Sequence, residues 1–253
     1  MTDRALNERC IVVTGLPGSG KTRVIQAALT QLPRLTKEMS LVESSDARLM
    51  RKEGSSLIID QVWCVVDVRT FFQLPRDAWL ADELKVLLEQ ADGIVFSFVE
   101  GASLEIQAQW SRWVRQYAKE LPIVRWLNQQ FPKDWHGFTA NRGGEKFNLP
   151  PLPRRHSFSF KVGKLSLKHL LFGLDSSKQN LGMKIIRVKG VVETFEYVNL
   201  VAIEGSALRW DTFAAKPKEV AGILVIEGID LERCWLEELV NASLLVGGKV
   251  DAH

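Results

Sequence analysis

The stretch CIVVTGLPGSGKTRVI, residues 10–25, decides the fold of this chain. Its apolar and β-branched residues 11–14 are typical of a buried strand. Residues 15–22, GLPGSGKT, then fit the pattern G-x-x-x-x-G-K-[ST] at every position. Residues 21–32 carry apolar side chains at helical spacing, and Pro33 is expected to end that helix.

This strand, glycine-rich loop and helix predict a phosphate site. Glycines let the backbone curl until successive N–H groups converge on one anion, and the following helix adds the positive end of its dipole. In such loops the lysine reaches the terminal phosphates and the hydroxyl binds Mg²⁺, so we expect a nucleoside triphosphate and Mg²⁺ as cofactors. The residues expected to line the site are Gly15, Pro17, Gly18, Ser19, Gly20, Lys21 and Thr22. The alternative is a glycine-rich turn without a ligand.

Strand and helix patterns alternate along the first half of the chain. Strands are expected at residues 39–43, 56–60, 62–68, 93–99 and 122–127, and helices at residues 77–90 and 103–120. This alternation predicts an α/β fold, a P-loop NTPase parallel sheet with helices on both faces.

The pattern changes after a segment rich in Gly, Pro and Asn. Beyond it, a strand is expected at residues 158–162, a helix at 165–174, strands at 185–195, 197–205 and 222–228, and a helix at 231–242. Strands that follow one another this closely predict a small α+β C-terminal domain with an antiparallel sheet. We therefore expect a nucleotide-binding domain over residues 1–132, a linker over 133–155 and a second domain over 156–253.

Composition and charge exclude few classes of function. The 253 residues carry a formal net charge of +3, too little to indicate nucleic acid or an anionic membrane. The basic stretch 154–169 could face nucleic acid, but a solvated linker leading into a strand is favoured. Cys10, Cys64 and Cys234 each lie among apolar residues, which predicts three buried free thiols in a reducing compartment. With no signal-peptide core and no apolar run of membrane-spanning length, the protein is expected to be cytoplasmic.

A P-loop enzyme also needs an acidic group at the end of a neighbouring strand. Glu43, Asp60 and Asp67 each end or interrupt a β-rich run, and the residues alone leave the choice between them open.

Four stretches resemble the CobW-type GTPases. SLVESSDA is similar to that family's E-[ST]-[ST]-G strand, VWCVVDVRTFF to its V-V-D-A strand, ADGIVFSF to its A-D-x-I-V-x-N-K strand, and IIRVKGVVE to its R-x-K-G strand. The resemblance implies that Gly20, Lys21 and Thr22 bind phosphate and Mg²⁺, with Glu43 as the acidic partner and metal ligand. It also implies GTP as the nucleotide, and a client protein or a metal-handling partner.

Three departures from that pattern are expected to have consequences. The segment that holds the family's C-x-C-C metal motif is missing, so a thiolate site for a soft metal is not expected. Asp46 stands where the family has glycine; it either repels a triphosphate or is an exposed turn residue. The guanine-reading N-K-x-D motif is replaced by residues 97–100, SFVE. Glu100 could accept the guanine hydrogen bonds and Phe98 could stack on the base, or this is only the end of a buried strand.

The resemblance and the intact loop favour a CobW-like GTP-binding protein with weak GTP hydrolysis, in which Lys21 and Glu43 are the catalytic residues and which assists metal or cofactor handling. A non-hydrolysing nucleotide-binding interaction module is the alternative, favoured by the missing segment. A small-molecule kinase is a third, since GLPGSGKT also suits that class. Nucleic acid and membrane are not expected as partners.

Overall fold

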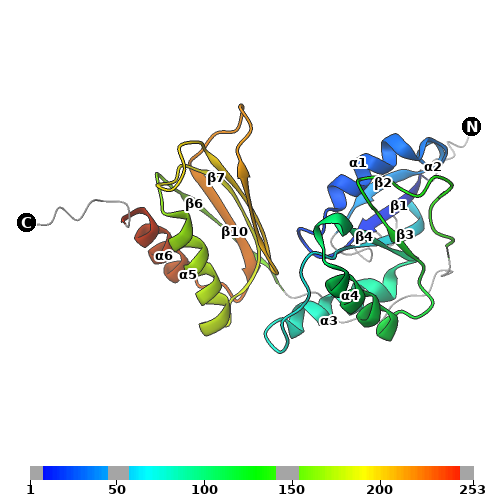
Figure 1. Cartoon of the computed structure of the whole chain (residues 1–253), viewed down its shortest axis with the longest axis horizontal. Helices are drawn as coiled ribbons and strands as arrows, with labels where there is room; N and C mark the ends of the chain where they lie inside the picture. Colours follow the sequence, from blue (N-terminus) through cyan, green and yellow to red (C-terminus); the bar gives the residue numbers. More distant parts are fainter. Residues whose placement is uncertain (1–7, 45–56, 141–153, 246–253) are drawn as a thin grey trace, which may run out of the picture. The chain divides into compact units, whose positions relative to one another are not determined.

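The computed structural model describes residues 8–44, 57–140 and 154–245, and the chain forms two compact units, Met1–Pro150 and Pro151–His253. Each unit holds one five-stranded sheet (Figure 1). The domain boundaries expected from the sequence, with a linker at residues 133–155, stay a prediction.

The N-terminal unit is built on a parallel sheet in the order β2-β1-β3-β4-β5. Its strands are β1 (Glu8–Thr14), β2 (Ser40–Glu43), β3 (Leu57–Asp67), β4 (Gly93–Ser97) and β5 (Ile123–Arg125). All five residues of β4 are buried, as expected for a central strand covered on both faces. The two strands predicted at residues 56–60 and 62–68 are one continuous strand, β3.

Helices cover both faces of this sheet. They are α1 (Lys21–Gln31), α2 (Pro33–Glu38), α3 (Ala78–Gln90) and α4 (Leu104–Tyr117), with a short 3₁₀ turn, η2 (Val99–Gly101). Figure 1 shows α1 and α2 on one side of the sheet and α3 and α4 on the other. On the α1 side, Val24 and Ala28 pack with Val13 and Trp63 in one core cluster. The predicted α/β fold is confirmed.

Pro33 ends α1 as predicted, but it also begins a new helix. The sequence suggests only a short polar connection between α1 and the strand at residues 39–43, but the structure has the six-residue helix α2 there. Proline is well suited to the first turn of a helix, because its φ is already helical and its missing N–H would have no helical partner there.

The C-terminal unit is an antiparallel sheet in the order β6-β10-β7-β8-β9. Its strands are β6 (His156–Lys161), β7 (Lys184–Val192), β8 (Val201–Ser206), β9 (Trp210–Ala214) and β10 (Ile223–Ile229). The helices α5 (Leu167–Asn180) and α6 (Arg233–Leu245) lie on one side of it (Figure 1). The α+β prediction is confirmed, although β9 was not predicted.

The first turn of α5 is capped by two side chains. The Ser166 hydroxyl accepts a hydrogen bond from the His169 N–H, and the Glu196 carboxylate accepts hydrogen bonds from the Ser166 hydroxyl and from the N–H groups of Leu167 and Lys168. Burial alone would raise the pKa of Glu196, but these hydrogen bonds outweigh it and hold the pKa below its ordinary value.

Among the described residues, no helix is both long enough and apolar enough to cross a membrane.

Candidate phosphate-binding site

The glycine-rich loop connects β1 to α1 and takes backbone conformations that favour glycine. Gly15, Gly18 and Gly20 have φ angles of +143°, +82° and +89°. A Cβ atom on Gly15 would collide with the backbone carbonyl oxygen of Val65 on β3. Pro17 is half-buried and Gly18 exposed, so they form the tip of the loop. A Cβ on Gly20 would likewise crowd the Phe98 ring, so at Gly15 and Gly20 both the φ angle and the available space require glycine.

Lys21 lies folded over the loop that precedes it. Its side chain is only 8% exposed, and its Nζ atom donates hydrogen bonds to the carbonyl oxygens of Gly15 (3.1 Å) and Leu16 (3.2 Å). The same atom lies 3.7 Å from Oε1 of Glu43. The ammonium group is therefore held at the loop by the loop's own backbone and by a carboxylate.

Thr22 and Glu43 are in direct contact. The Thr22 hydroxyl donates a 2.7 Å hydrogen bond to Oε2 of Glu43. Glu43 is the last residue of β2, which pairs in parallel with β1 so that Glu43 lies level with Val13. The structure thus brings together the hydroxyl and the carboxylate that the sequence analysis assigned to Mg²⁺, and hard oxygen ligands of this kind suit that ion.

The two other acidic candidates are engaged elsewhere. Asp60 pairs with Arg9 through two hydrogen bonds of 2.8 and 2.9 Å. Asp67, at the end of β3, binds the guanidinium group of Arg69, with a shortest distance of 2.6 Å. Of the three acids, Glu43 is the one whose carboxylate contacts Thr22 of the loop.

The residues in place of N-K-x-D contact the loop in a way that sequence reasoning missed. Ser97, fully buried at the end of β4, donates a 2.7 Å hydrogen bond to the carbonyl oxygen of Ser19. The Val66 carbonyl oxygen lies 3.1 Å from the same hydroxyl. A hydroxyl has one proton, so the shorter contact to the loop is the main one. The polar residue at the end of a buried strand was the only signal available.

Phe98 lies against the loop and between cations. Its φ of +55° is unusual for a bulky residue. The nearest carbon of its ring lies 2.9 Å from the position that a Cβ on Gly20 would occupy. The guanidinium carbons of Arg69 and Arg23 lie 3.8 and 4.9 Å from its ring centroid. Glu100, in η2, is exposed to solvent. The phenyl ring is therefore beside the loop, while the carboxylate expected to read the base faces solvent.

Two buried hydroxyls near the loop carry unused hydrogen-bonding capacity. Among the described residues, neither Ser19 Oγ nor Thr14 Oγ1 has a hydrogen-bond partner, and both residues are at most 3% exposed. A buried hydroxyl without a partner costs about 1–3 kcal/mol, so a ligand that accepts from it is stabilised. The Ser19 hydroxyl and the Lys21 ammonium fit an anion, and Thr22 with Glu43 fits Mg²⁺.

The thiols and histidines do not form a metal centre in the described part of the chain, where no three His, Cys, Asp or Glu side chains cluster. Cys10 and Cys64 are buried as predicted, but the prediction for Cys234 is wrong, because this thiol lies exposed on α6. Burial raises the pKa of the Cys64 thiol to about 12, with Lys21 partly opposing it. Asp46 lies outside the described residues.

No family model matches the chain, and no curated protein does so either. The chain is structurally similar to the Zn(II)-bound YjiA GTPase from E. coli, with a TM-score of 0.36, and to a Zn(II)-bound triple mutant of that GTPase, with a TM-score of 0.37. In both cases the identity is 12%, and the match covers 93% of this chain and 98% of the other.

YjiA is a CobW-type GTPase. Similarity at these TM-scores says nothing about activity, which has to be inferred from the loop and its contacts.

Proposed function

We propose that this chain binds GTP with Mg²⁺ at the loop of residues 15–22 and hydrolyses it slowly. One observation carries the proposal: the Thr22 hydroxyl lies 2.7 Å from the Glu43 carboxylate, with the Lys21 ammonium 3.7 Å from the same carboxylate. A hydroxyl, a carboxylate and a lysine arranged around a glycine loop are the parts that phosphoryl-transfer sites share.

Each of these groups has a distinct role in the proposal. The backbone N–H groups of the loop and the start of α1 bind the phosphate oxygens. Lys21 neutralises the terminal phosphates, exchanging its bonds to Gly15 and Leu16 for bonds to the anion. Thr22 and Glu43 would hold Mg²⁺, and this ion would supply positive charge to the phosphate oxygens.

The base is proposed to lie at Phe98 and Glu100. The ring of Phe98 is close enough to the loop to stack on a base whose phosphates are bound there, and a carboxylate at Glu100 can accept the two N–H groups of guanine. Arg69 already lies 3.8 Å from that ring centroid. A base that stacks on Phe98 competes with Arg69, and we therefore expect weak binding of the base.

A non-hydrolysing nucleotide binder is the second candidate. The bonds of Lys21 to its own loop favour it, because this ammonium has to leave two carbonyl oxygens before it can stabilise a transition state. Positioning supplies most of the rate in phosphoryl transfer, so such a rearrangement lowers turnover more than binding. The sequence resemblance alone supports a further part of the proposal, assistance in metal or cofactor handling with a client protein or metal-handling partner.

Calorimetric titration of GTP and ATP, with and without Mg²⁺, tests the proposal. We expect GTP to bind below roughly 100 µM, the scale of ordinary substrate constants. Lys21→Ala should weaken binding at least about tenfold, the loss of one charged hydrogen bond. Glu43→Gln should remove most of the Mg²⁺-dependent part of the affinity. Lys119→Ala, an exposed lysine beyond α4, is the matched control and should leave binding unchanged.

Steady phosphate release that Lys21→Ala abolishes would establish the hydrolase, and binding without release would establish the second candidate. Absence of binding by either nucleotide at millimolar protein and ligand would refute both.

A further inference from the structure

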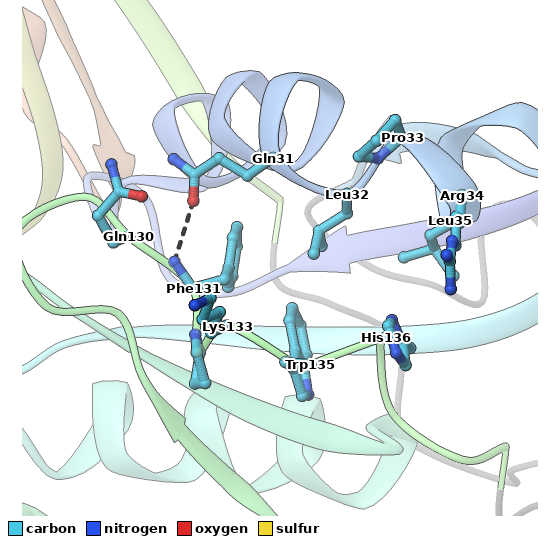
Figure 2. Close-up of a pocket in the computed structure, with 11 residues that line it drawn as sticks. Gln31, Leu32, Pro33, Arg34, Leu35, Gln130, Phe131, Lys133, Trp135 and His136 are labelled. Carbon is cyan, nitrogen blue, oxygen red and sulfur yellow. Dashed lines mark hydrogen bonds between the residues drawn. The ribbon is translucent and has the colours of Figure 1, made fainter.

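A second pocket lies in the N-terminal unit, at the opposite end of α1 from the phosphate loop. Its volume is about 370 Å³. Because α1 has eleven residues, the two sites are separated by roughly 16 Å of helix. We name it the Trp135 pocket; its lining residues include Leu32, Arg34, Phe131, Lys133, Trp135 and His136 (Figure 2). Its lining residues are separate from the phosphate loop and from Glu43, Ser97 and Phe98.

The chain that forms one wall of this pocket is fixed in place. The Gln31 side-chain amide donates to the carbonyl oxygen of Gln129 (2.7 Å) and accepts from the N–H of Phe131 (3.0 Å). Further along, the N–H of Phe138 donates to Oε1 of Gln61, 3.1 Å away. Figure 2 shows the bond between Gln31 and Phe131 on the left of the pocket, where it joins α1 to the loop below it. A loop tied to the core at both ends forms a pocket without reorganisation, which favours ligand binding.

The inside of the pocket is apolar and contains a flat ring. Leu32, Leu35 and Phe131 are at most 9% exposed, and they form its base. Trp135 stacks on Phe131, with ring centroids 4.8 Å apart and planes 21° apart, and is itself only partly buried. A second flat ring can therefore pack on Trp135 as Trp135 packs on Phe131.

Among the described residues that line this pocket, three carry basic side chains and none carries a carboxylate. Arg34 comes from α2, and Lys133 and His136 come from the loop after β5. In Figure 2 Trp135 lies between Lys133 and His136. A smaller hollow of about 210 Å³ adjoins at Arg34 and His136, where Glu38 also contributes. Within the described residues, neither Arg34 nor Lys133 forms an ion pair with a carboxylate, so both charges are available to an anion.

We propose that the Trp135 pocket binds a small planar organic anion, an aromatic ring that carries a carboxylate or a phosphate. The ring packs on Trp135 over Leu32, and the anionic group is bound by the guanidinium fork of Arg34, with Lys133 and the His136 imidazole adding charge and a donor. The volume lies at the lower end of the ~300–1,000 Å³ range of ligand pockets, so it suits one or two fused rings. The proposal does not depend on nucleotide binding.

Four probes separate the ring from the charge in calorimetric titrations at low ionic strength, where exposed charges are least screened. We expect 2-naphthoate to bind at least tenfold more tightly than the neutral 2-naphthylmethanol and at least tenfold more tightly than inorganic phosphate at this pocket. Phenyl phosphate is the second anion, and the tighter of the two aryl anions identifies the acidic group. Tighter binding of either aryl anion, the carboxylate or the phosphate, supports the proposal.

Substitutions then place the binding at this pocket. Arg34→Gln should weaken 2-naphthoate binding at least threefold and Trp135→Leu at least tenfold, whereas Lys37→Gln, an exposed lysine of the same helix α2 outside the lining, should leave it unchanged. If Trp135→Leu fails to fold, the Arg34→Gln/Lys133→Gln double variant, which changes two exposed side chains, still tests the proposal. Equal binding of the neutral alcohol, or wild-type binding by the Arg34→Gln/Lys133→Gln double variant, would overturn the proposal.

Discussion

Replacing Ser97 with alanine tests whether the end of β4 holds the phosphate loop in place. The substitution removes one buried hydroxyl and leaves the Ser19 carbonyl oxygen, 2.7 Å away, without that donor. A buried acceptor left unsatisfied costs about 1–3 kcal/mol, and about 2 kcal/mol lowers the melting temperature of a unit of this size by roughly 4–8 °C. If about 1.4 kcal/mol of the loss is the cost of re-ordering the loop, nucleotide affinity falls about tenfold.

Thermal unfolding followed by circular dichroism and calorimetric titration with Mg²⁺·GTP measure the two effects. Ser111→Ala is the matched control, because its hydroxyl donates to the Gln107 carbonyl oxygen within α4, an oxygen that also accepts the helix N–H. It should change stability by less than about 0.5 kcal/mol. The hydrogen bond from Ser97 to the loop has no functional role if Ser97→Ala destabilises the protein no more than Ser111→Ala does. The same conclusion follows if Ser97→Ala lowers the melting temperature without lowering the affinity for the nucleotide.

Three further results are expected. Gly15→Ala should destabilise the protein by more than about 2 kcal/mol in chemical denaturation, since the added Cβ collides with a backbone oxygen. Gly163→Ala, where the added Cβ meets open space, should be nearly neutral, and equal effects of the two substitutions would contradict the close packing of the loop. Glu196→Gln should lower the melting temperature at neutral pH, and the difference from wild type should disappear as the pH falls below 4.5. The reason is that a lowered carboxyl pKa stabilises the folded state only while the carboxylate is ionised; a pH-independent difference would count against the cap. In native alkylation Cys234 should react first and Cys64 only after denaturation, since burial raises the pKa of the Cys64 thiol to about 12; simultaneous reaction would contradict this burial.

Features set by local sequence were predictable. The strand, glycine loop and helix around residues 15–22 follow from steric rules that act over a few residues, and the structure places positive φ angles at Gly15, Gly18 and Gly20. The alternation of strands and helices also identified the parallel sheet, because both periods are visible in the order of apolar residues.

Features set by distant contacts were not predictable. The hydrogen bond from Ser97 joins residues 78 positions apart, and no local pattern encodes it. The edge strand β9 was missed because its residues are half-buried or exposed, so it lacks the apolar alternation that marks a covered strand. Cys234 lies in an apolar stretch but on the outer face of α6, which shows that apolar neighbours in sequence do not determine which side of a helix is buried.

Strand register explains why sequence could propose three acids but not choose among them. In a parallel sheet an acid can reach the loop after β1 only if it lies level with the end of that strand or beyond it. Glu43 lies opposite Val13, one residue before the end of β1 at Thr14, and therefore meets the first turn of α1. Asp60 lies lower, at the irregularity where β3 pairs with the middle of β1, so register keeps it away from the loop. Asp67 lies level with Ser97, whose hydroxyl does reach the loop, but the Asp67 carboxylate binds the Arg69 guanidinium instead. Register thus excludes Asp60, and a local ion pair engages Asp67, which leaves Glu43 as the acid in contact with Thr22.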